Sequence, residues 1–256
     1  MMRFENKVVL ITGGAGQIGK AVAKRFLSEG ANLALVDLNL EVLKRAAEEL
    51  GMNDSHLLLA ADVSDESQTK AYVDATVERF GQIDVFFNNA GITGSRQAIH
   101  EMDMARWQKL MDVNLRGILL GLKYVLPVMY NQNTGSVINT ASQAGMRAQP
   151  CGADYCVSKA AILMLTKVGA IEAGPHGVRV NAILPGIVKS EMILQNNAKM
   201  GISEEAFAKQ LAGMVPLGRW AELDEIAKAV LFLGSDEASY ISGVEFKVDG
   251  GSLAKS

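Results

Sequence analysis

Cysteine and histidine are scarce in this 256-residue sequence, which holds two cysteines and three histidines. Cys151 and Cys156 are too few for a disulfide framework, and their spacing does not match a structural zinc site. His56, His100 and His176 lie far apart and fit neither a metal-binding pattern nor a catalytic triad. We therefore predict reduced thiols and no bound metal.

Long apolar runs, an excess of basic charge and low-complexity stretches are also missing. No apolar run reaches the about 18 residues that a membrane span needs. The first residues, "MMRFENKVVLITGG", lack the apolar core and cleavage site of a signal peptide. The formal net charge of -3 indicates no basic surface for nucleic acid. Because no repeat or linker divides the chain, we expect one domain over residues 1–256, a cytoplasmic location, and neither nucleic acid nor a membrane as partner.

Short apolar runs rich in branched residues alternate with amphipathic stretches of helical length. The expected strands are "KVVLIT", "NLALVD", "HLLLAADV", "IDVFFNNAG", "GSVINTAS", "VRVNAILPG" and "VEFKV". The expected helices cover residues 19–30, 39–50, 64–81, 112–130, 154–172 and 223–233. This alternation is typical of β-α-β units. It predicts an α/β protein with a Rossmann-like, doubly wound sheet of seven parallel strands and helices on both faces.

The stretch "ITGGAGQIG", residues 11–19, follows the first expected strand and opens a helix. Gly14, Gly16 and Gly19 fit the dinucleotide fingerprint G-x-G-x-x-G, whereas the register T-G-x-x-x-G-x-G places Gln17 where a glycine is expected. Backbone amides at such a helix start can hold a pyrophosphate. We predict a phosphate loop with the Gln17 side chain pointing outward; a glycine turn without a ligand is the alternative.

The second expected strand ends in Asp37. An acidic residue at this place accepts hydrogen bonds from the adenosine ribose and repels the 2′-phosphate of NADP. No Arg or Lys follows before Lys44 to attract that phosphate. The sequence therefore predicts NAD as the cofactor, unless Asp37 is simply a surface residue at the end of a strand.

A tyrosine and a lysine four residues apart, Tyr155 and Lys159, share one face of an expected helix. A tyrosine normally titrates near pKa 10, and a neighbouring ammonium lowers that pKa, which makes Tyr155 a candidate general acid and base. Ser142 ends a strand at the carboxyl edge of the sheet, where its hydroxyl can hold the reacting oxygen. Alone, the tyrosine–lysine pair is a weak signal, because chance pairs at this spacing are common and most of them lie on a solvated helix face.

Together these motifs resemble the short-chain dehydrogenase/reductase family over essentially the whole chain. The matching stretches are "TGGAGQIG", "ADV" at 61–63, "NNAG" at 88–91, "VNLRG" at 113–117, Ser142, "YCVSK" at 155–159 and "LPGIV" at 184–188. The family uses the T-G-x-x-x-G-x-G register, so Gln17 is a departure from it. With Gly16 adjacent, we expect an altered loop that still binds the cofactor.

The resemblance implies a role for each matching residue. Tyr155 would be the catalytic acid and base, Lys159 would lower its pKa and bind the nicotinamide ribose, Ser142 would orient the substrate, and Asn114 would hold a water in a proton relay. The implied cofactor-binding residues are Gly13, Gln17, Ile18, Gly19, Asp37, Asp62, Val63, Asn89, Gly91, Tyr155, Lys159, Pro185, Gly186, Ile187 and Val188. For Asn114, a helix-interior polar residue bonded to the backbone is the alternative.

The segment from about 189 to 214 corresponds to the family's variable substrate lid. Its apolar residues are Met192, Ile193, Met200, Phe207, Leu211 and Met214. These side chains would either pack against the rest of the protein or cover an apolar substrate. The other expected substrate-wall residues are Thr93, Gln143, Met146, Gln149 and Cys151. We expect a neutral, mostly apolar secondary alcohol or ketone, with cyclic compounds included; an inward-pointing Arg147 would instead favour an anion.

Two other functions are compatible with the same motifs. A nucleotide-sugar epimerase or dehydratase uses the same tyrosine–lysine pair with tightly held NAD, but such enzymes usually carry a longer carboxyl-terminal substrate domain. A non-catalytic NAD(H) sensor could share the fold without the chemistry. The stretch 62–92 resembles cyclic-ketone reductases of the family. The family also implies a homotetramer that packs through the helices at 112–130 and 154–172 and the last strand.

Overall fold

The computed structural model describes residues 2–191, 194 and 201–255, and every structural statement refers to these residues. The strands are β1 (Val8–Thr12), β2 (Asn32–Asp37), β3 (Leu57–Ala60), β4 (Val85–Asn88), β5 (Gly135–Thr140), β6 (Val178–Pro185) and β7 (Glu245–Val248). They form one sheet in the order β3-β2-β1-β4-β5-β6-β7, and every neighbouring pair is parallel. The predicted fold class is confirmed.

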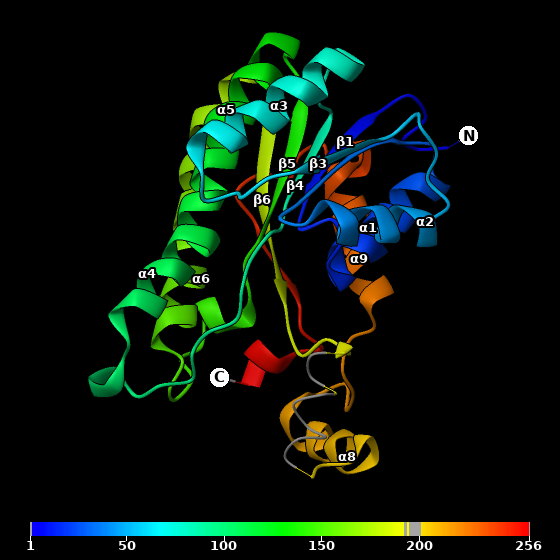
Figure 1. Ribbon diagram of the computed structural model, residues 1–256. Helices are drawn as coiled ribbons and strands as arrows, with labels where there is room; N and C mark the ends of the chain where they lie inside the picture. Colours follow the sequence, from blue (N-terminus) through cyan, green and yellow to red (C-terminus); the bar gives the residue numbers. More distant parts are fainter. Residues whose placement is uncertain (1, 192–193, 195–200, 256) are drawn as a thin grey trace.

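Helices cover both faces of this sheet (Figure 1). One face carries α1 (Gln17–Ser28), α2 (Leu40–Glu49) and α9 (Leu223–Gly234), and the other carries α3 (Glu66–Phe80), α5 (Gly117–Gln132) and α6 (Ala153–Ala173). Val9 and Ile11 of β1 pack in one apolar core with the first set, whereas Leu10 packs in a second core with the other. Successive strand side chains point to opposite faces, so a doubly covered strand must be apolar throughout.

The sheet order creates a switch point between β1 and β4. From β1 the chain winds outward to β2 and β3, then returns to place β4 against the other side of β1. Ligands of open α/β folds bind outside the carboxyl ends of the strands at such a point. Thr12, Asn88, Thr140 and Pro185 end β1, β4, β5 and β6 at this edge.

The expected helix at 112–130 is longer than predicted and is interrupted. A separate helix α4 (Met104–Met111) begins after Asp103, whose side chain accepts hydrogen bonds from the backbone N–H groups of Ala105 and Arg106. A π-helical turn, Asp112–Arg116, joins α4 to α5. A π-turn inserts an extra residue into a helix and often marks a functional position.

The expected lid contains α8 (Glu204–Met214), which the Ser203 side chain caps (Figure 1). Phe207 stacks on Trp220 with ring centroids 5.9 Å apart, and Leu211 is fully buried beside them. Part of the predicted apolar stripe therefore forms a small core of its own, whereas Met214 is 47% exposed. The expected lid residues Met192, Ile193 and Met200 lie outside the described residues.

Within the described part of the chain, none of the helices is long and apolar enough to cross a membrane.

Candidate active site

The phosphate loop, residues 12–19, has glycine where the backbone allows nothing else. Gly13 adopts a φ of +67°, and a Cβ there would lie 2.9 Å from the Asn89 Nδ2. A Cβ on Gly19 would lie 2.1 Å from the carbonyl oxygen of Gly13, so the helix packs directly on the turn. Gly16 caps α1 without a side chain. The helix start thus presents backbone amides to a ligand, as the pyrophosphate prediction requires.

Gln17, the departure from the family pattern, is the first residue of α1. Its Oε1 accepts a hydrogen bond of 2.9 Å from the backbone N–H of Glu191, 174 residues away in the sequence. The side chain therefore does not simply point outward, as the sequence led us to expect. It links the phosphate loop to the chain that follows β6.

Asp37 lies at the end of β2, across from the phosphate loop. Its Oδ2 accepts a hydrogen bond from the Ala15 N–H at 3.0 Å, and its Oδ1 accepts one from the Leu38 N–H at 2.8 Å. These two bonds fix a half-buried carboxylate beside the loop. Farther along this edge, Asp62 accepts hydrogen bonds from the N–H and hydroxyl of Ser64.

The carboxyl ends of β1, β4 and β5 are connected by side chains. The Thr12 Oγ1 accepts hydrogen bonds from the N–H groups of Asn89 and Ala90. The Asn89 amide donates to the Thr12 carbonyl and accepts from the Thr140 hydroxyl. Thr140 in turn accepts a 2.8 Å hydrogen bond from the Lys159 Nζ on its carbonyl oxygen. Lys159, the predicted partner of Tyr155, is thereby anchored to the strands that carry the predicted cofactor residues.

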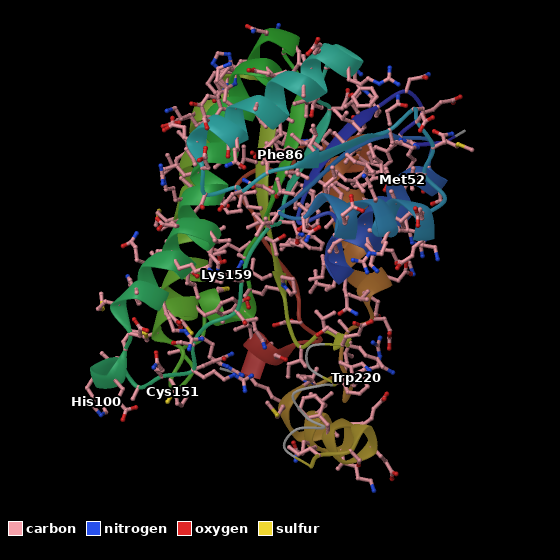
Figure 2. All side chains as sticks on the ribbon, in the orientation of Figure 1. Met52, Phe86, His100, Cys151, Lys159 and Trp220 are labelled. Carbon is pink, nitrogen blue, oxygen red and sulfur yellow. The ribbon has the colours of Figure 1, made fainter. Side chains whose placement is uncertain are left out.

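Tyr155 and Lys159 lie on one face of α6, as predicted, with the Lys159 Nζ 5.6 Å from the centre of the tyrosine ring. Lys159 is 4% exposed and stands between α6 and the sheet (Figure 2), and burial lowers its pKa to about 8. Burial raises the pKa of Tyr155, and a hydrogen bond with the Ser142 side chain opposes that rise only in part. The expected lowering of the Tyr155 pKa is therefore absent in this arrangement, because desolvation of the phenol outweighs the other influences.

Asn114 occupies the π-turn and is fully buried. Its Oδ1 accepts from the Ile92 N–H at 2.7 Å, and its Nδ2 donates to the Ile92 carbonyl at 2.9 Å. A Cβ on Gly91 would lie 3.2 Å from this Oδ1 and 3.7 Å from the Lys159 Nζ. Asn114 thus holds the chain after β4 directly against the lysine.

Asp154 is a site residue that the sequence analysis missed. It is 1% exposed, and its two carboxylate oxygens accept 2.7 Å hydrogen bonds from the N–H groups of Ser95 and Tyr155. A Cβ on Gly94 would lie 2.9 Å from the Tyr155 Cβ. The chain at 93–95 is therefore held against Tyr155. An acidic residue in the first turn of a helix usually faces solvent, so the sequence carried no signal for this burial.

The predicted substrate-wall residues differ in exposure. Gln143 is 6% exposed, and its Oε1 has no hydrogen-bond partner within the described residues. Met146 is 45% exposed, and Thr93, Gln149 and Cys151 are also exposed. Met192 lies outside the described residues. Gln143 directly follows Ser142 in the sequence. A hydrogen-bond donor on a ligand could pair with its amide oxygen.

The chain after β6 forms the opposite wall of the site. A Cβ on Gly186 would lie 2.7 Å from the Asp249 Cα, so this turn packs tightly against the chain after β7. Ile187 and Lys189 exchange backbone hydrogen bonds of 2.8 Å with Ala221, and the intervening Val188 is buried. Residues 186–189 are therefore well fixed.

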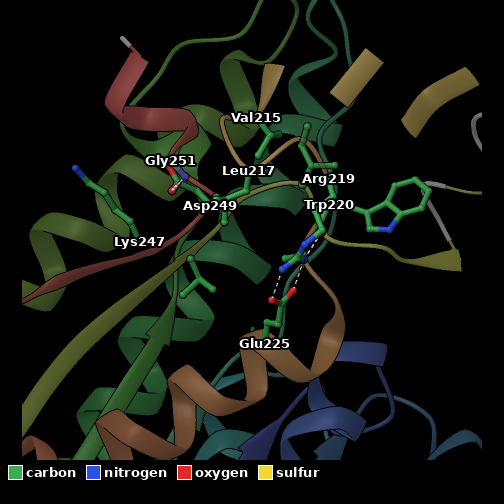
Figure 3. Close-up of a pocket in the computed structure, with 12 residues that line it drawn as sticks. Val215, Leu217, Arg219, Trp220, Glu225, Lys247, Asp249 and Gly251 are labelled. Carbon is green, nitrogen blue, oxygen red and sulfur yellow. Dashed lines mark hydrogen bonds and ion pairs between the residues drawn. The ribbon is translucent and has the colours of Figure 1, made fainter. Parts of the chain in front are cut away.

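A cavity of about 220 Å³ lies behind this wall (Figure 3). Ile187, Trp220 and Asp249 line it, and Arg219 and Glu225 form an ion pair with two 2.7 Å hydrogen bonds at its rim. Neither Ser142, Tyr155 nor Lys159 contributes to its lining. This cavity is therefore separate from the predicted catalytic residues.

Comparisons with known proteins agree with this geometry. A family model described as enoyl-(acyl carrier protein) reductase matches residues 13–252. The chain is 43% identical to levodione reductase of Leifsonia aquatica over 98% of this chain and 96% of the relative. A crystal structure of levodione reductase superposes with a TM-score of 0.92 at 41% identity, covering 99% of this chain and 100% of the other.

A second solved structure, an NAD+-bound xylitol dehydrogenase, gives a TM-score of 0.90 at 35% identity, covering 97% of this chain and 100% of the other. The predicted resemblance to the family, and within it to levodione reductase-like enzymes, is confirmed. The chain belongs to the short-chain dehydrogenase/reductase family of oxidoreductases.

Proposed function

We propose that this protein is an NAD(H)-dependent oxidoreductase that interconverts neutral, mostly apolar secondary alcohols and ketones, cyclic compounds included. The observation that carries the proposal is the buried Lys159, which lies 5.6 Å from the centre of the Tyr155 ring and donates a 2.8 Å hydrogen bond to the Thr140 carbonyl. Ser142 follows the same strand and lies near enough to Tyr155 to oppose the rise in pKa that burial causes there. A solvated helix face would not bury a lysine or fix it to a strand carbonyl.

The residues present fit a dinucleotide. Gly13 and Gly19 let α1 begin directly against the turn that follows β1, and the Asp37 carboxylate is held at the end of β2. Asp37 would accept hydrogen bonds from the adenosine ribose and repel a 2′-phosphate, which supports NAD over NADP. The NAD+ in the xylitol dehydrogenase structure supports a nicotinamide cofactor here. The remaining cofactor contacts carried over from the family resemblance stay predictions.

A nicotinamide held by these residues would supply the chemistry of hydride transfer. Tyr155 donates a proton to the carbonyl oxygen in reduction and accepts it from the hydroxyl in oxidation. Ser142 donates a hydrogen bond to the same oxygen and keeps it within reach of Tyr155. The Lys159 ammonium stabilises the phenolate after Tyr155 has given up its proton, which offsets the cost of forming that charge in a buried place.

The proposed substrate class rests on the wall residues. Met146 offers an apolar surface, and the side chains of Thr93 and Gln149 are uncharged. A neutral ligand suits these groups better than an anion. The likeness to levodione reductase supports a ketone as the oxidised substrate. A cytoplasmic location stays a prediction.

We further propose a homotetramer. One face of α6 exposes Val157, Met164, Val168 and Ile171, and α5 exposes Leu119. Ile171 is 77% exposed. A row of large apolar side chains on one helix face is typical of a protein interface, and a second copy of the chain would cover it. Size-exclusion chromatography with light scattering tests this assembly.

The experiment for the function is a panel of cyclic, linear and acidic ketones and alcohols, assayed with NADH, NADPH and their oxidised forms. We expect turnover of neutral ketones with NADH, and an Asp37→Ala variant should lose most of the preference for NADH over NADPH. Tight NADH binding without turnover would favour a sensor. Turnover of a nucleotide sugar without net NADH consumption would favour an epimerase.

A further inference from the structure

The hydrogen bond between Gln17 and Glu191 joins two parts of the chain that the proposed function assigns to the same cofactor. Gln17 begins the helix whose amides would hold the pyrophosphate. Glu191 follows the segment 185–188, which would contact the nicotinamide end. Since the Gln17 Oε1 and the Glu191 nitrogen are 2.9 Å apart, one side chain spans the distance between these walls.

Both ends of this link are attached to fixed structure. On one side, Gly16 and Gly19 hold the turn against the carbonyl oxygen of Gly13. On the other side, backbone hydrogen bonds between Ile187, Lys189 and Ala221 tie the chain to the start of α9. Because each of the two segments is anchored independently, the link fixes the distance between them.

The residue at position 17 is also where the sequence leaves the family pattern. A glycine there, as the pattern expects, has no side chain and could not accept the Glu191 N–H. A shorter amide or an apolar side chain of equal length could not make the bond either. The sequence departure and the contact across 174 residues are independent observations, and they coincide at one side chain.

We propose that Gln17 is a positioning residue that ties the phosphate loop to the chain after β6 and slows the exchange of the dinucleotide. This inference rests on the proposed NAD(H) site. A cofactor that lies between the two walls passes this link when it enters or leaves. Loss of the link should raise both the association rate and the dissociation rate of the dinucleotide. The dissociation constant should change less than either rate, because the link is a barrier to exchange and not a contact with the dinucleotide.

The test compares Gln17→Met, which keeps the length of the side chain but removes the acceptor, with Gln17→Glu, which keeps an acceptor at the same reach. Stopped-flow NADH fluorescence gives the association and dissociation rates. We expect Gln17→Met to raise the dissociation rate about three- to tenfold with a smaller change in the dissociation constant. Gln17→Glu should restore slow dissociation but weaken the affinity, since its charge repels the pyrophosphate.

Hydrogen exchange of the cofactor-free protein supplies a second readout. The Glu191 amide should exchange several-fold faster in Gln17→Met than in the parent protein, and the amides of the phosphate loop should change little. Unchanged exchange and unchanged NADH rates in Gln17→Met would overturn the inference while the proposed function stands. Failure of the parent protein itself to bind NADH would overturn both.

Discussion

At the predicted phosphate loop the candidate site depends on the absence of side chains, whereas at the predicted catalytic residues it depends on side chains that are buried. Gly13 and Gly19 keep the helix start open because any Cβ would collide with backbone or amide atoms. Ser142 follows β5, whereas Tyr155 and Lys159 lie on α6, and their proposed function requires burial and hydrogen bonds to hold them together. Changes at the first region should therefore act on folding and binding, and changes at the second on chemistry and proton affinity.

The largest expected effect is on chemistry alone. Tyr155→Phe removes the proton donor and should lower kcat/KM by about 10³-fold, within the range for general acid–base catalysis. NADH binding should change little, because the ring still fills its place. Tyr240→Phe removes the hydroxyl of a fully exposed tyrosine and is the matched control. Comparable activity of the two variants would mean that Tyr155 does not carry the proton.

A large effect on stability is expected at the phosphate loop. Gly19→Ala places a Cβ 2.1 Å from a backbone oxygen and should lower the free energy of unfolding by about 3 kcal/mol. Gly213→Ala, in α8, meets nothing within 4 Å and should raise it by up to about 1 kcal/mol through helix propensity. Urea unfolding of both variants measures this. Equal stabilities would show that the loop can relax around a Cβ.

A somewhat smaller effect is expected at Asp154. Asp154→Asn retains one acceptor oxygen and leaves the Ser95 or the Tyr155 N–H unpaired, which should cost about 2 kcal/mol of stability. Burial raises the pKa of Asp154, but hydrogen bonds from Ser95 and from the backbone outweigh it, so the pKa is lowered overall.

The sign of the pH dependence at Asp154 follows from this lowered pKa. The carboxylate stabilises the fold above its unfolded pKa, and that stabilisation is lost as the pH falls through the folded pKa. Urea midpoints of parent and variant should therefore converge in acid. If the difference in urea midpoint between parent and variant stays constant from pH 7 into acid, the charge of Asp154 does not stabilise the fold.

The smallest expected effect is the pH dependence of NADH binding through Lys159. Burial lowers the pKa of Lys159 to about 8, so the ammonium is lost in the cofactor-free protein as the pH rises through that value. The NADH dissociation constant should rise about fivefold between pH 7 and pH 9. Lys159→Arg keeps its charge and should show a flat profile. A parent profile as flat as that of the arginine variant would argue against this role.

The parallel sheet and the common helix face of Tyr155 and Lys159 were predictable from the sequence because each rests on a local pattern. Alternating apolar runs indicated the strands, and the four-residue spacing of Tyr155 and Lys159 indicated a shared helix face. α4 was missed although a local signal was present, since Asp103 is a capping residue and the apolar residues of Met104–Met111 recur at the helical period. The π-turn at Asn114 depends on hydrogen bonds to Ile92, which no local pattern encodes.

The sequence by itself determined the fold class, the family and the identity of the groups that meet at the sheet edge. The periodicity of apolar residues and the spacing of motif residues are properties of short stretches. They can be read from the sequence without knowing how distant parts of the chain pack. Only the tertiary structure decided that Gln17 reaches Glu191, that Asp154 is buried beneath residues 93–95, and that burial raises the pKa of Tyr155. Those outcomes depend on distances between residues far apart in the chain and on how much water their packing excludes.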